Sequence, residues 1–317
     1  MIEGIPRISV LIITYNQEDV IKRAVESLLS QKDYIYEICV SDDCSKDTTW
    51  DIVQEYSKQY PGLFVLNRNN PNVGIFENIE KTWTMPSGDI VYQLAGDDEC
   101  GEGWFKEVVD FVISNNIDYK NDLFCVYGDY MNIYPNGDSF RFSNKLVNSD
   151  IAPLKLSLRG LIGNRSTCFS KRILDSFRKV SKGHSHIAED AIDRQLQFFA
   201  KQNYYIPYVG NIYYANIGTC IRINDDILKE REQIRPYAIH LLESWGASFD
   251  KSDINYSLYY FNAFHRSNHH PSFKNRLKAL YLYIKSYDPL IGLKCLNIRR
   301  IVFLFIKRIP HRKPINW

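Results

Sequence analysis

Three short polar clusters carry the residue types that could bind a phosphorylated ligand. They are TYNQE at 14–18, DDCSKD at 42–47 and GDDE at 96–99, and each directly follows an apolar run. Such runs are typical of buried strands, and open α/β sheets bind ligands at the carboxyl ends of their strands. Acids that converge beside a nucleotide diphosphate need a divalent cation between them, because carboxylates and phosphates otherwise repel each other. The pattern therefore predicts a nucleotide site with a bound metal.

Each cluster also has an ordinary structural explanation. Asp42, Asp43 and Ser45 are residue types that cap the amino terminus of a helix. Asp97 and Asp98 are compatible with a turn, and Thr and Asn are common loop residues. The functional interpretation depends on all three clusters following strands of one sheet, in sequence order.

The first hundred residues alternate short apolar runs with helical patterns, which predicts parallel strands joined by crossover helices. The expected strands cover residues 8–13, 36–41, 64–66 and 90–95. The expected helices run from residue 20 to about residue 31, across residues 50–56 before Pro61-Gly62, and over 75–84. This unit is predicted to be a compact α/β nucleotide-binding architecture.

The rest of the chain is read more coarsely. We expect helices over 104–114, 154–161 and 187–199, a strand over 124–133 before the turn at Pro135-Asn136-Gly137, and one or two strands over 204–214. From residue 227 the sequence becomes helical and aromatic and then basic, without a Gly/Ser linker. The predicted division is a domain of residues 1–225, in halves 1–100 and 101–225, and a helical region of residues 226–317.

Together these motifs resemble family 2 glycosyltransferases, which are inverting enzymes with the GT-A fold, a Rossmann-like mixed sheet flanked by helices. The resemblance lies between residues 8 and 99 and is carried by SVLIITYNQEDVIKRAVESLLSQ, ICVSDDCSKDTTWDIV, NPNVGIFENIE and SGDIVYQLAGDDE. It continues more loosely to about residue 200. It implies that residues 1–225 form the catalytic domain, with a nucleotide-binding half at 1–100 and an acceptor half at 101–225.

The resemblance also implies which residues contact the donor nucleotide. Asp42 or Asp43 would accept hydrogen bonds from the base, usually uracil, and Gly74 would permit close backbone approach. The full implied set is Thr14, Tyr15, Asn16, Glu18, Asp42, Asp43, Asn72, Gly74 and Asp97.

Asp97 and Asp98 match the metal-binding motif of the family, which implies a site for Mn²⁺ or Mg²⁺. The metal would stabilise the charge of the departing nucleotide diphosphate. Ala95 stands where the commonest form of the motif has its first Asp, so the metal would have fewer acidic ligands here.

The general base is expected in HIAEDAIDRQ at 186–195, which resembles the Glu-Asp motif that the family carries at the start of a helix. Asp190 is the first choice and Glu189 the second. The alternative is that these acids only favour a helix amino terminus through the dipole. His184 and His186 are either a metal or phosphate contact or ordinary loop residues.

The acceptor is expected near NRSTCF at 164–169, where the family often shapes the acceptor pocket. Arg165 would meet an anionic acceptor there, with Ser166 beside it.

Composition excludes several classes of protein. The 317 residues are 45% hydrophobic and 24% charged, which does not fit disorder, collagen or a coiled coil. Seven Cys without a CxxC pair support neither a disulfide scaffold nor a zinc ribbon, and they fit a reducing compartment. We find no signal peptide and no apolar stretch near the roughly 18 residues of a spanning helix, and therefore expect a cytoplasmic protein.

Charge is unevenly distributed along the chain. Residues 271–317 carry eleven Lys and Arg against one acid, a net charge of +10, whereas the whole chain carries only +2. A basic amphipathic helix in this region would lie on an anionic bilayer surface, at the inner face of the cell membrane. The alternative is a helix that packs on the catalytic domain with its charges in water. Nucleic acid is not an expected partner, because no known binding module accompanies the charge.

The sequence thus predicts a metal-dependent inverting glycosyltransferase. It would move a sugar from a nucleotide-sugar donor, a UDP-sugar, to a glycan or lipid-linked saccharide in cell-surface polysaccharide assembly. The alternative is a catalytically silent module of the same fold that binds a nucleotide or a partner. A nucleotidyltransferase is disfavoured because TYNQE has no Gly-rich basic loop, and a dehydrogenase because no GxGxxG follows the first strand.

Overall fold

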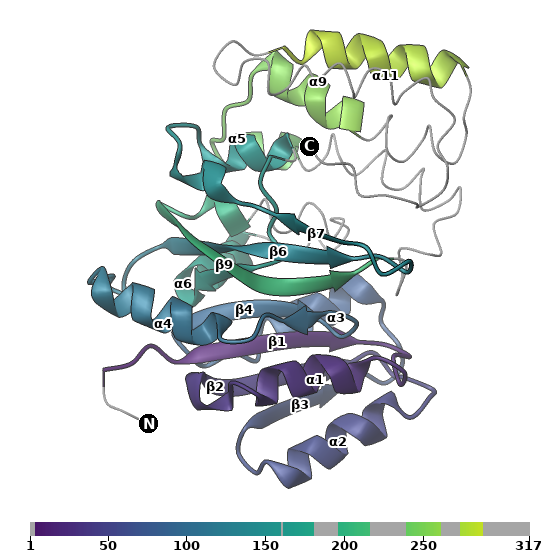
Figure 1. The fold of residues 1–317 in the computed structure, drawn as a ribbon, viewed down its shortest axis with the longest axis vertical. Coiled ribbons are helices and arrows are strands. Elements are labelled where there is room, and N and C mark those ends of the chain that lie inside the picture. Colours follow the sequence, from purple (N-terminus) through teal and green to yellow (C-terminus); the bar gives the residue numbers. More distant parts are fainter. Residues whose placement is uncertain (1–3, 160, 181–195, 216–238, 261–272, 288–317) are drawn as a thin grey trace.

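The computed structural model describes residues 4–159, 161–180, 196–215, 239–260 and 273–287. Within these residues the centre of the molecule is one mixed sheet with the strand order β3-β2-β1-β4-β8-β6-β9-β5, and β7 pairs with β6 (Figure 1). The strands are β1 (Ile8–Thr14), β2 (Ile35–Asp42), β3 (Phe64–Arg68), β4 (Ile90–Ala95), β5 (Glu99–Cys100), β6 (Phe124–Ile133), β7 (Ser139–Phe142), β8 (Thr167–Ser170) and β9 (Gln202–Tyr214).

The described helices lie mainly in the connections between these strands. They are α1 (Ile21–Leu29), α2 (Thr49–Gln59), α3 (Ile75–Thr82), α4 (Trp104–Ser114), α5 (Pro153–Leu158), α6 (Lys171–Val180), α9 (Lys251–Tyr260) and α11 (Phe273–Lys285), with short 3₁₀ helices η1 (Lys32–Tyr34) and η2 (Lys145–Asn148).

The first four strands are parallel wherever they pair, and their register brings the three polar clusters together. Thr14 lies beside Asp42 in the β1–β2 pair, and Ile13 lies beside Ala95 in the β1–β4 pair. The loops that follow β1, β2 and β4 therefore leave the sheet at the same edge. This confirms the parallel arrangement that the sequence predicts.

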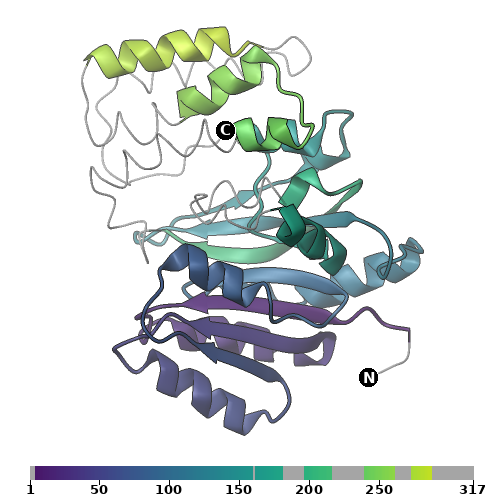
Figure 2. The same cartoon turned by 180° about the vertical axis from the view of Figure 1, so that it is seen from behind.

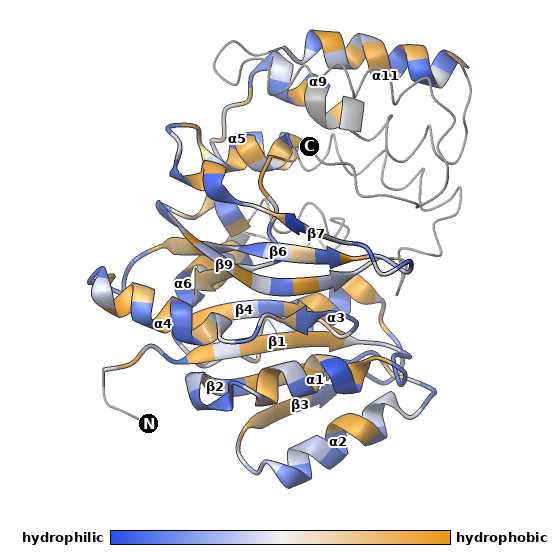
Figure 3. Ribbon diagram, viewed as in Figure 1, coloured by the Kyte–Doolittle hydropathy of each residue, from blue (hydrophilic) through white to orange (hydrophobic). Residues whose placement is uncertain are grey.

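Helices cover both faces of the sheet, because successive side chains of a strand point to opposite faces. Val10 and Ile12 of β1 belong to the core beneath α1, α2 and α4, whereas Leu11 belongs to the core beneath α3 and α6. Figures 1 and 2 show the two helical layers from opposite sides, and Figure 3 shows the apolar strands between them. Helix α1 illustrates the fit, since its buried residues Ile21, Ala24, Val25 and Leu28 recur every three or four positions.

Most predicted elements are confirmed. The strands at 90–95 and 124–133 and the helix at 104–114 match β4, β6 and α4 at both ends, and the region 204–214 is the single long strand β9. Patterns did not reveal β5, β7, β8 and α6. Two to four residues are too few to show alternation in β5, β7 and β8, and α6 starts directly after β8 without a separating turn. Most of the helix expected over 187–199 lies outside the described residues.

Helices α9 and α11 lie beyond the sheet, at the end of the molecule opposite β3 (Figure 1). Helix α5 connects them to the sheet, because Arg159 at its carboxyl end is completely buried between them. The boundary predicted at residue 225 lies outside the described residues, so the division into domains stays a prediction. In the described part of the chain, no helix has the length and apolar character needed to cross a bilayer.

Candidate active site

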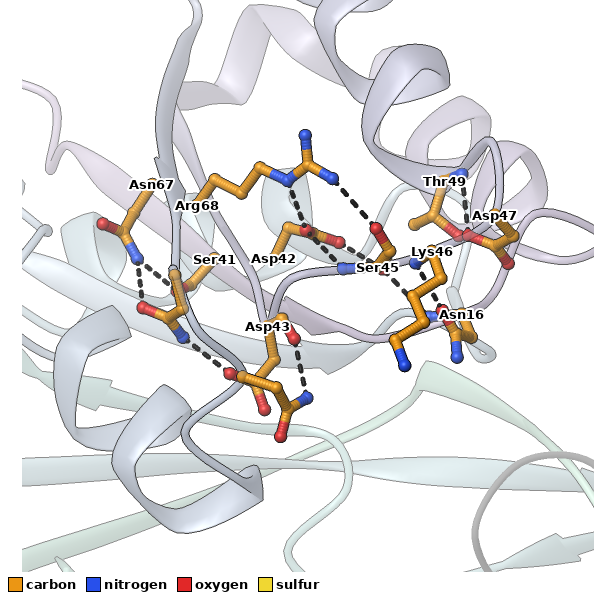
Figure 4. Close-up of polar contacts among 12 residues, drawn as sticks. Asn16, Ser41, Asp42, Asp43, Ser45, Lys46, Asp47, Thr49, Asn67 and Arg68 are labelled. Carbon is orange, nitrogen blue, oxygen red and sulfur yellow. Dashed lines mark hydrogen bonds and ion pairs between the residues drawn. The ribbon is translucent and has the colours of Figure 1, made fainter.

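The loops after β1 and β2 are joined by reciprocal hydrogen bonds. Asn16, which has a positive φ of 50°, donates its N–H to Ser45 Oγ at 3.0 Å, and its Oδ1 accepts the N–H of Lys46 at 2.9 Å (Figure 4). Glu18 Oε2 accepts the N–H and the hydroxyl of Thr48, at 2.9 and 2.7 Å. Asn16 and Glu18 therefore hold the two loops in register, whatever further contact they make with a ligand.

The loop after β1 also packs against the metal motif. Thr14 is buried and donates its hydroxyl to Gln17 at 2.8 Å, whereas Tyr15 is 39% exposed. A Cβ at Gly96 would collide with Gln17 and stand 3.2 Å from the carbonyl of Ile13. The lack of a side chain at Gly96 therefore lets the first and third clusters pack closely together.

Asp42 is fully buried, and protein donors occupy both of its carboxylate oxygens. Oδ1 accepts the N–H of Ser45 at 3.0 Å, and Oδ2 accepts the Ser45 hydroxyl. Arg68 Nε stands 3.4 Å from Oδ1, and Arg68 Nη2 donates to the carbonyl of Ser45 at 2.9 Å. Asp42 thus fixes the turn that begins the second loop, as Figure 4 shows.

Asp43 holds the Asn72–Gly74 segment. Its oxygens accept the N–H groups of Val73 and Gly74, both at 2.9 Å, and Asn72 donates its side chain to the Asp43 carbonyl at 2.7 Å. Gly74 has φ 88° and ψ 163°, a conformation that is essentially restricted to glycine, and a Cβ there would meet no atom within 4 Å. The need for glycine is therefore conformational. The roles of Asp42 and Asp43 in reading a base, and of Asn72 and Gly74 in closing over a nucleotide, stay predictions.

An asparagine network beneath this segment was missed by the sequence analysis. Asn69 donates to Asp43 Oδ1 and to Asn78 Oδ1, both at 2.9 Å. Asn78 also accepts the hydroxyl of Ser41 at 2.6 Å, and Asn67 donates to Ser41 Oγ at 2.9 Å. The available signal was the run NRNNPN at 67–72, which starts at the end of the third strand, since clustered Asn residues commonly satisfy loop backbone.

The metal motif turns sharply after β4, where the Asp98 N–H donates to the carbonyl of Ala95 at 3.1 Å. Asp98 is 3% exposed, and Arg165 Nη1 stands 3.6 Å from its Oδ2. Burial raises the pKa of Asp98 to about 7, although the charge of Arg165 opposes this shift. Burial likewise raises the pKa of Asp97, whose carbonyl accepts Arg23 Nη2 at 2.6 Å.

These residues fit a hard divalent cation. Asp97 and Asp98 offer carboxylate oxygens, and the raised pKa of Asp98 means that its negative charge is incompletely compensated. The buried amide oxygen of Asn211, a neighbour of Asp98, accepts no hydrogen bond from the described residues. No group of three His, Cys, Asp or Glu gathers in the described ranges. Magnesium sites commonly use one or two carboxylates and complete their shell with water and substrate phosphates.

Two arginines stack on neighbouring tyrosines at the end of β9 and contact the metal motif. Arg23 precedes this motif in the chain and Arg165 follows it. Arg23 lies 3.6 Å above the ring of Tyr214 and 3.1 Å from Glu99, whose carboxylate also accepts the Tyr214 hydroxyl at 2.6 Å. Arg165 lies 3.6 Å above the ring of Tyr213. Cation–π contacts of this kind orient a guanidinium and add to its ion pairs. The sequence analysis predicted neither of these arginine–tyrosine contacts.

The segment expected to shape the acceptor pocket lies next to the metal motif. Ser166 is fully buried and donates to the carbonyl of Asp129 at 2.7 Å, so it anchors the loop from which Arg165 extends. The acceptor roles predicted for Arg165 and Ser166 are untested by this geometry. Asp190 and Glu189, expected as base candidates, lie outside the described residues together with His184 and His186.

The sheet order, the flanking helices and the acidic turn after β4 define the class of GT-A nucleotide-diphospho-sugar transferase folds, as the resemblance implied. Residues 9–171 match the family described as Glycosyl transferase family 2. The match covers more than half of the chain, and the protein therefore belongs to glycosyl transferase family 2.

Relatives in sequence are bacterial and share only part of their length with this chain. An uncharacterized glycosyltransferase of Haemophilus influenzae is 26% identical over 166 residues, which is 49% of each chain. An uncharacterized protein of Mycobacterium tuberculosis is 32% identical over 91 residues, 28% of this chain and 26% of the relative. Chondroitin synthase of Pasteurella multocida is 28% identical over 136 residues, 43% of this chain and 13% of the synthase. The chain thus spans from about an eighth to half of these relatives.

Among solved structures, the chain is similar to residues 1–349 of TarS from S. aureus. The comparison covers 94% of this chain and 83% of that one, with a TM-score of 0.58 and 14% identity. The same protein in complex with UDP gives a TM-score of 0.60 at 13% identity, covering 94% of this chain and 89% of that one. At this level of identity the likeness establishes the fold.

Proposed function

We propose that the protein transfers a sugar, with inversion, from a UDP-sugar to a saccharide or lipid-linked saccharide acceptor in cell-surface polysaccharide assembly. The observation that carries this proposal is the meeting of three loops at one sheet edge, with the buried carboxylate of Asp98 beside them. Solved TarS in complex with UDP-GlcNAc and the chondroitin synthase relatives support a UDP-sugar and a polysaccharide product.

The proposed chemistry divides between residues of the site. The loops after β1 and β2 would bind the nucleoside, with Asp42 or Asp43 toward the base and Tyr15 among the contacts. Asp97 and Asp98 would hold Mn²⁺ or Mg²⁺, which when bound supplies positive charge for the departing diphosphate. Asp190 would take the proton of the acceptor hydroxyl as it attacks the anomeric carbon, with Glu189 as the second candidate.

A panel of UDP-sugars tests the proposal. We expect one UDP-sugar to release UDP in the presence of Mn²⁺, slowly to water and faster when a saccharide acceptor is added. Asp98→Asn should abolish release, and the matched exposed variant Asp33→Asn should leave it unchanged. Binding of UDP without turnover on any acceptor would instead support the silent module.

The silent module has two observations in its favour. Ala95 replaces an acid of the commonest motif, and Arg165 already pairs with Asp98. Both reduce the negative charge available to a metal. The transferase remains the better interpretation, because two carboxylates and a diphosphate are sufficient ligands for a divalent cation.

We also propose that helix α11 places the enzyme on the anionic inner face of the cell membrane. Its exposed apolar side chains are spaced so that they share one face: Phe273 (69% exposed), Leu277 (44%), Tyr281 (60%) and Ile284 (58%). Residues 273–285 contain four Lys and Arg and no acid. An apolar stripe flanked by Lys suits the boundary between acyl chains and anionic headgroups.

Liposome sedimentation tests this surface. The protein should bind vesicles that contain phosphatidylglycerol and should not bind pure phosphatidylcholine. The double variant Leu277→Ser, Ile284→Ser should lose binding while folding normally, since both side chains are exposed. Equal binding by the double variant would contradict the membrane role of α11.

A further inference from the structure

In the metal motif, the carboxylate of Asp98 already pairs with the guanidinium of Arg165. Arg165 Nη1 stands 3.6 Å from Asp98 Oδ2, and the two side chains differ in exposure, at 41% for Arg165 and 5% for Asp98. The carboxylate is thus buried, whereas the Arg165 side chain is partly exposed.

The backbone around Arg165 is anchored although the Arg165 side chain is partly exposed. Ser166, the next residue, is fully buried and bonded to Asp129, and the preceding residue, Asn164, accepts a hydrogen bond from Gln197. The ring of Tyr213 supports the guanidinium at 3.6 Å. A guanidinium held by its face keeps its N–H donors along the plane, where they can bind carboxylate or phosphate oxygens in pairs.

A divalent cation and Arg165 compete for the same carboxylate. A cation bound to Asp98 would stand beside the guanidinium, and two positive charges in a partly buried site repel each other strongly. A diphosphate removes the conflict, because its oxygens can accept the guanidinium and ligate the cation at the same time.

We infer that Arg165 makes cation binding at Asp98 conditional on the nucleotide diphosphate. In the free protein the guanidinium offsets part of the charge of Asp98 and disfavours the metal, and on donor binding it turns to the phosphate oxygens. This inference rests on the proposed function and names a residue that couples the two ligands of that site. By linkage, the diphosphate must tighten the cation by the same factor as the cation tightens the diphosphate.

Arg23 provides a matched comparison in the same site. It rests on Tyr214 at the same 3.6 Å, but its partners are the carboxylate of Glu99 and the carbonyl of Asp97. Neither partner is a proposed metal-ligating atom. Arg23 should therefore hold the loop in place and act on the metal site only through its charge near Asp97.

The experiment measures Mn²⁺ affinity by the EPR signal of free Mn²⁺, without nucleotide and with saturating UDP. In the wild type, UDP should tighten Mn²⁺ binding by about tenfold or more. Arg165→Met should bind Mn²⁺ alone about threefold tighter, and UDP in the presence of Mn²⁺ about tenfold more weakly. The coupling between the two ligands should then fall, and what remains reflects direct ligation of the cation by the diphosphate.

Two further variants separate charge from folding. Arg165→Lys retains the positive charge and should still disfavour Mn²⁺ in the absence of UDP. Arg23→Met should tighten Mn²⁺ binding less than Arg165→Met does, because Arg23 pairs with Glu99 and acts only on the charge of Asp97. Thermal unfolding checks that each variant folds, and Arg165→Lys keeps the test available if Arg165→Met does not.

The inference is overturned if Arg165→Met binds Mn²⁺ alone no more tightly than the wild type, or if its coupling factor is unchanged. The proposed function fails differently: the wild type would then bind no UDP at any Mn²⁺ concentration. The Mn²⁺ titration without nucleotide still reports on the competition between Arg165 and the cation in that case.

Discussion

Arg159 Nε donates to Asp253 Oδ1 at 2.6 Å, and the two side chains are only 0% and 2% exposed. The same guanidinium donates to the carbonyl of Ser286 at 2.9 Å. One buried arginine at the end of α5 therefore holds both α9 and α11, and it fixes the exposed face of α11 relative to the catalytic sheet.

Removing this arginine should loosen the C-terminal helices. Arg159→Met leaves Asp253 buried without its main counter-charge, and we expect a loss of about 3–5 kcal/mol in the free energy of unfolding. The exposed pair of Lys106 and Asp110 supplies the control, since Lys106→Met should leave stability almost unchanged. Urea unfolding and limited proteolysis within residues 239–287 would measure the difference, and equal losses in the two variants would contradict this role.

Asp43 should be more sensitive to substitution than its position in a loop suggests. Asp43→Asn replaces one acceptor oxygen by an amide donor that faces the N–H of Val73 or Gly74. We expect a loss of about 2–3 kcal/mol in the free energy of unfolding, together with weaker UDP binding. Asp33→Asn, on a carboxylate that is 87% exposed, is the matched control. A neutral effect on both unfolding and UDP binding would contradict the assignment of Asp43 as the holder of this segment.

Asp98 should give the metal-free protein a distinct pH dependence. Its pKa is raised to about 7 by burial, so between about pH 4 and pH 7 the folded state binds more protons than the unfolded state. This group therefore lowers stability as pH rises through that window, by at most about 1.4 kcal/mol per pH unit. Asp98→Asn lacks the effect and should gain stability relative to the wild type between pH 5 and pH 8. Thermal unfolding of both proteins at pH 5 and pH 8 measures this gain. The same stability difference between variant and wild type at both pH values would contradict the prediction.

Asp190 should affect turnover without affecting donor binding. If Asp190 is the general base, Asp190→Asn should lower kcat by about 10²- to 10⁴-fold and leave the UDP-sugar Kd unchanged. Asp193→Asn, on an acid of the same motif, is the control and should retain most activity. If Glu189→Gln, rather than Asp190→Asn, loses the activity, the second candidate is the base.

Much of the fold follows from local pattern. Parallel strands such as β1 and β4 are buried on both faces and appear as apolar runs, and α1 and α4 show a clear helical period. The order of the sheet beyond β4 does not follow from pattern, because β8 inserts between β4 and β6 with only four residues. Such pairing depends on contacts that are distant in sequence.

The candidate site was likewise only partly predictable from the sequence. The positions of the three clusters were predictable because polar residues that follow parallel strands gather at one edge. The hydrogen-bond and ion-pair partners of those residues could not be predicted. Tyr213 and Arg165 meet across different elements, and Asp43 is engaged by backbone N–H groups, which leave no trace in a sequence.

The central claim is that the edge formed by the loops after β1, β2 and β4 binds a nucleotide diphosphate through a divalent cation. A crystal structure with UDP and Mn²⁺, with data collected for anomalous scattering, tests it most directly. The account predicts an anomalous peak in contact with the carboxylate of Asp98 and with the diphosphate, and the uracil beside the loop that contains Asp42 and Asp43. Manganese or UDP bound elsewhere, with Asp98 still paired to Arg165, would contradict it.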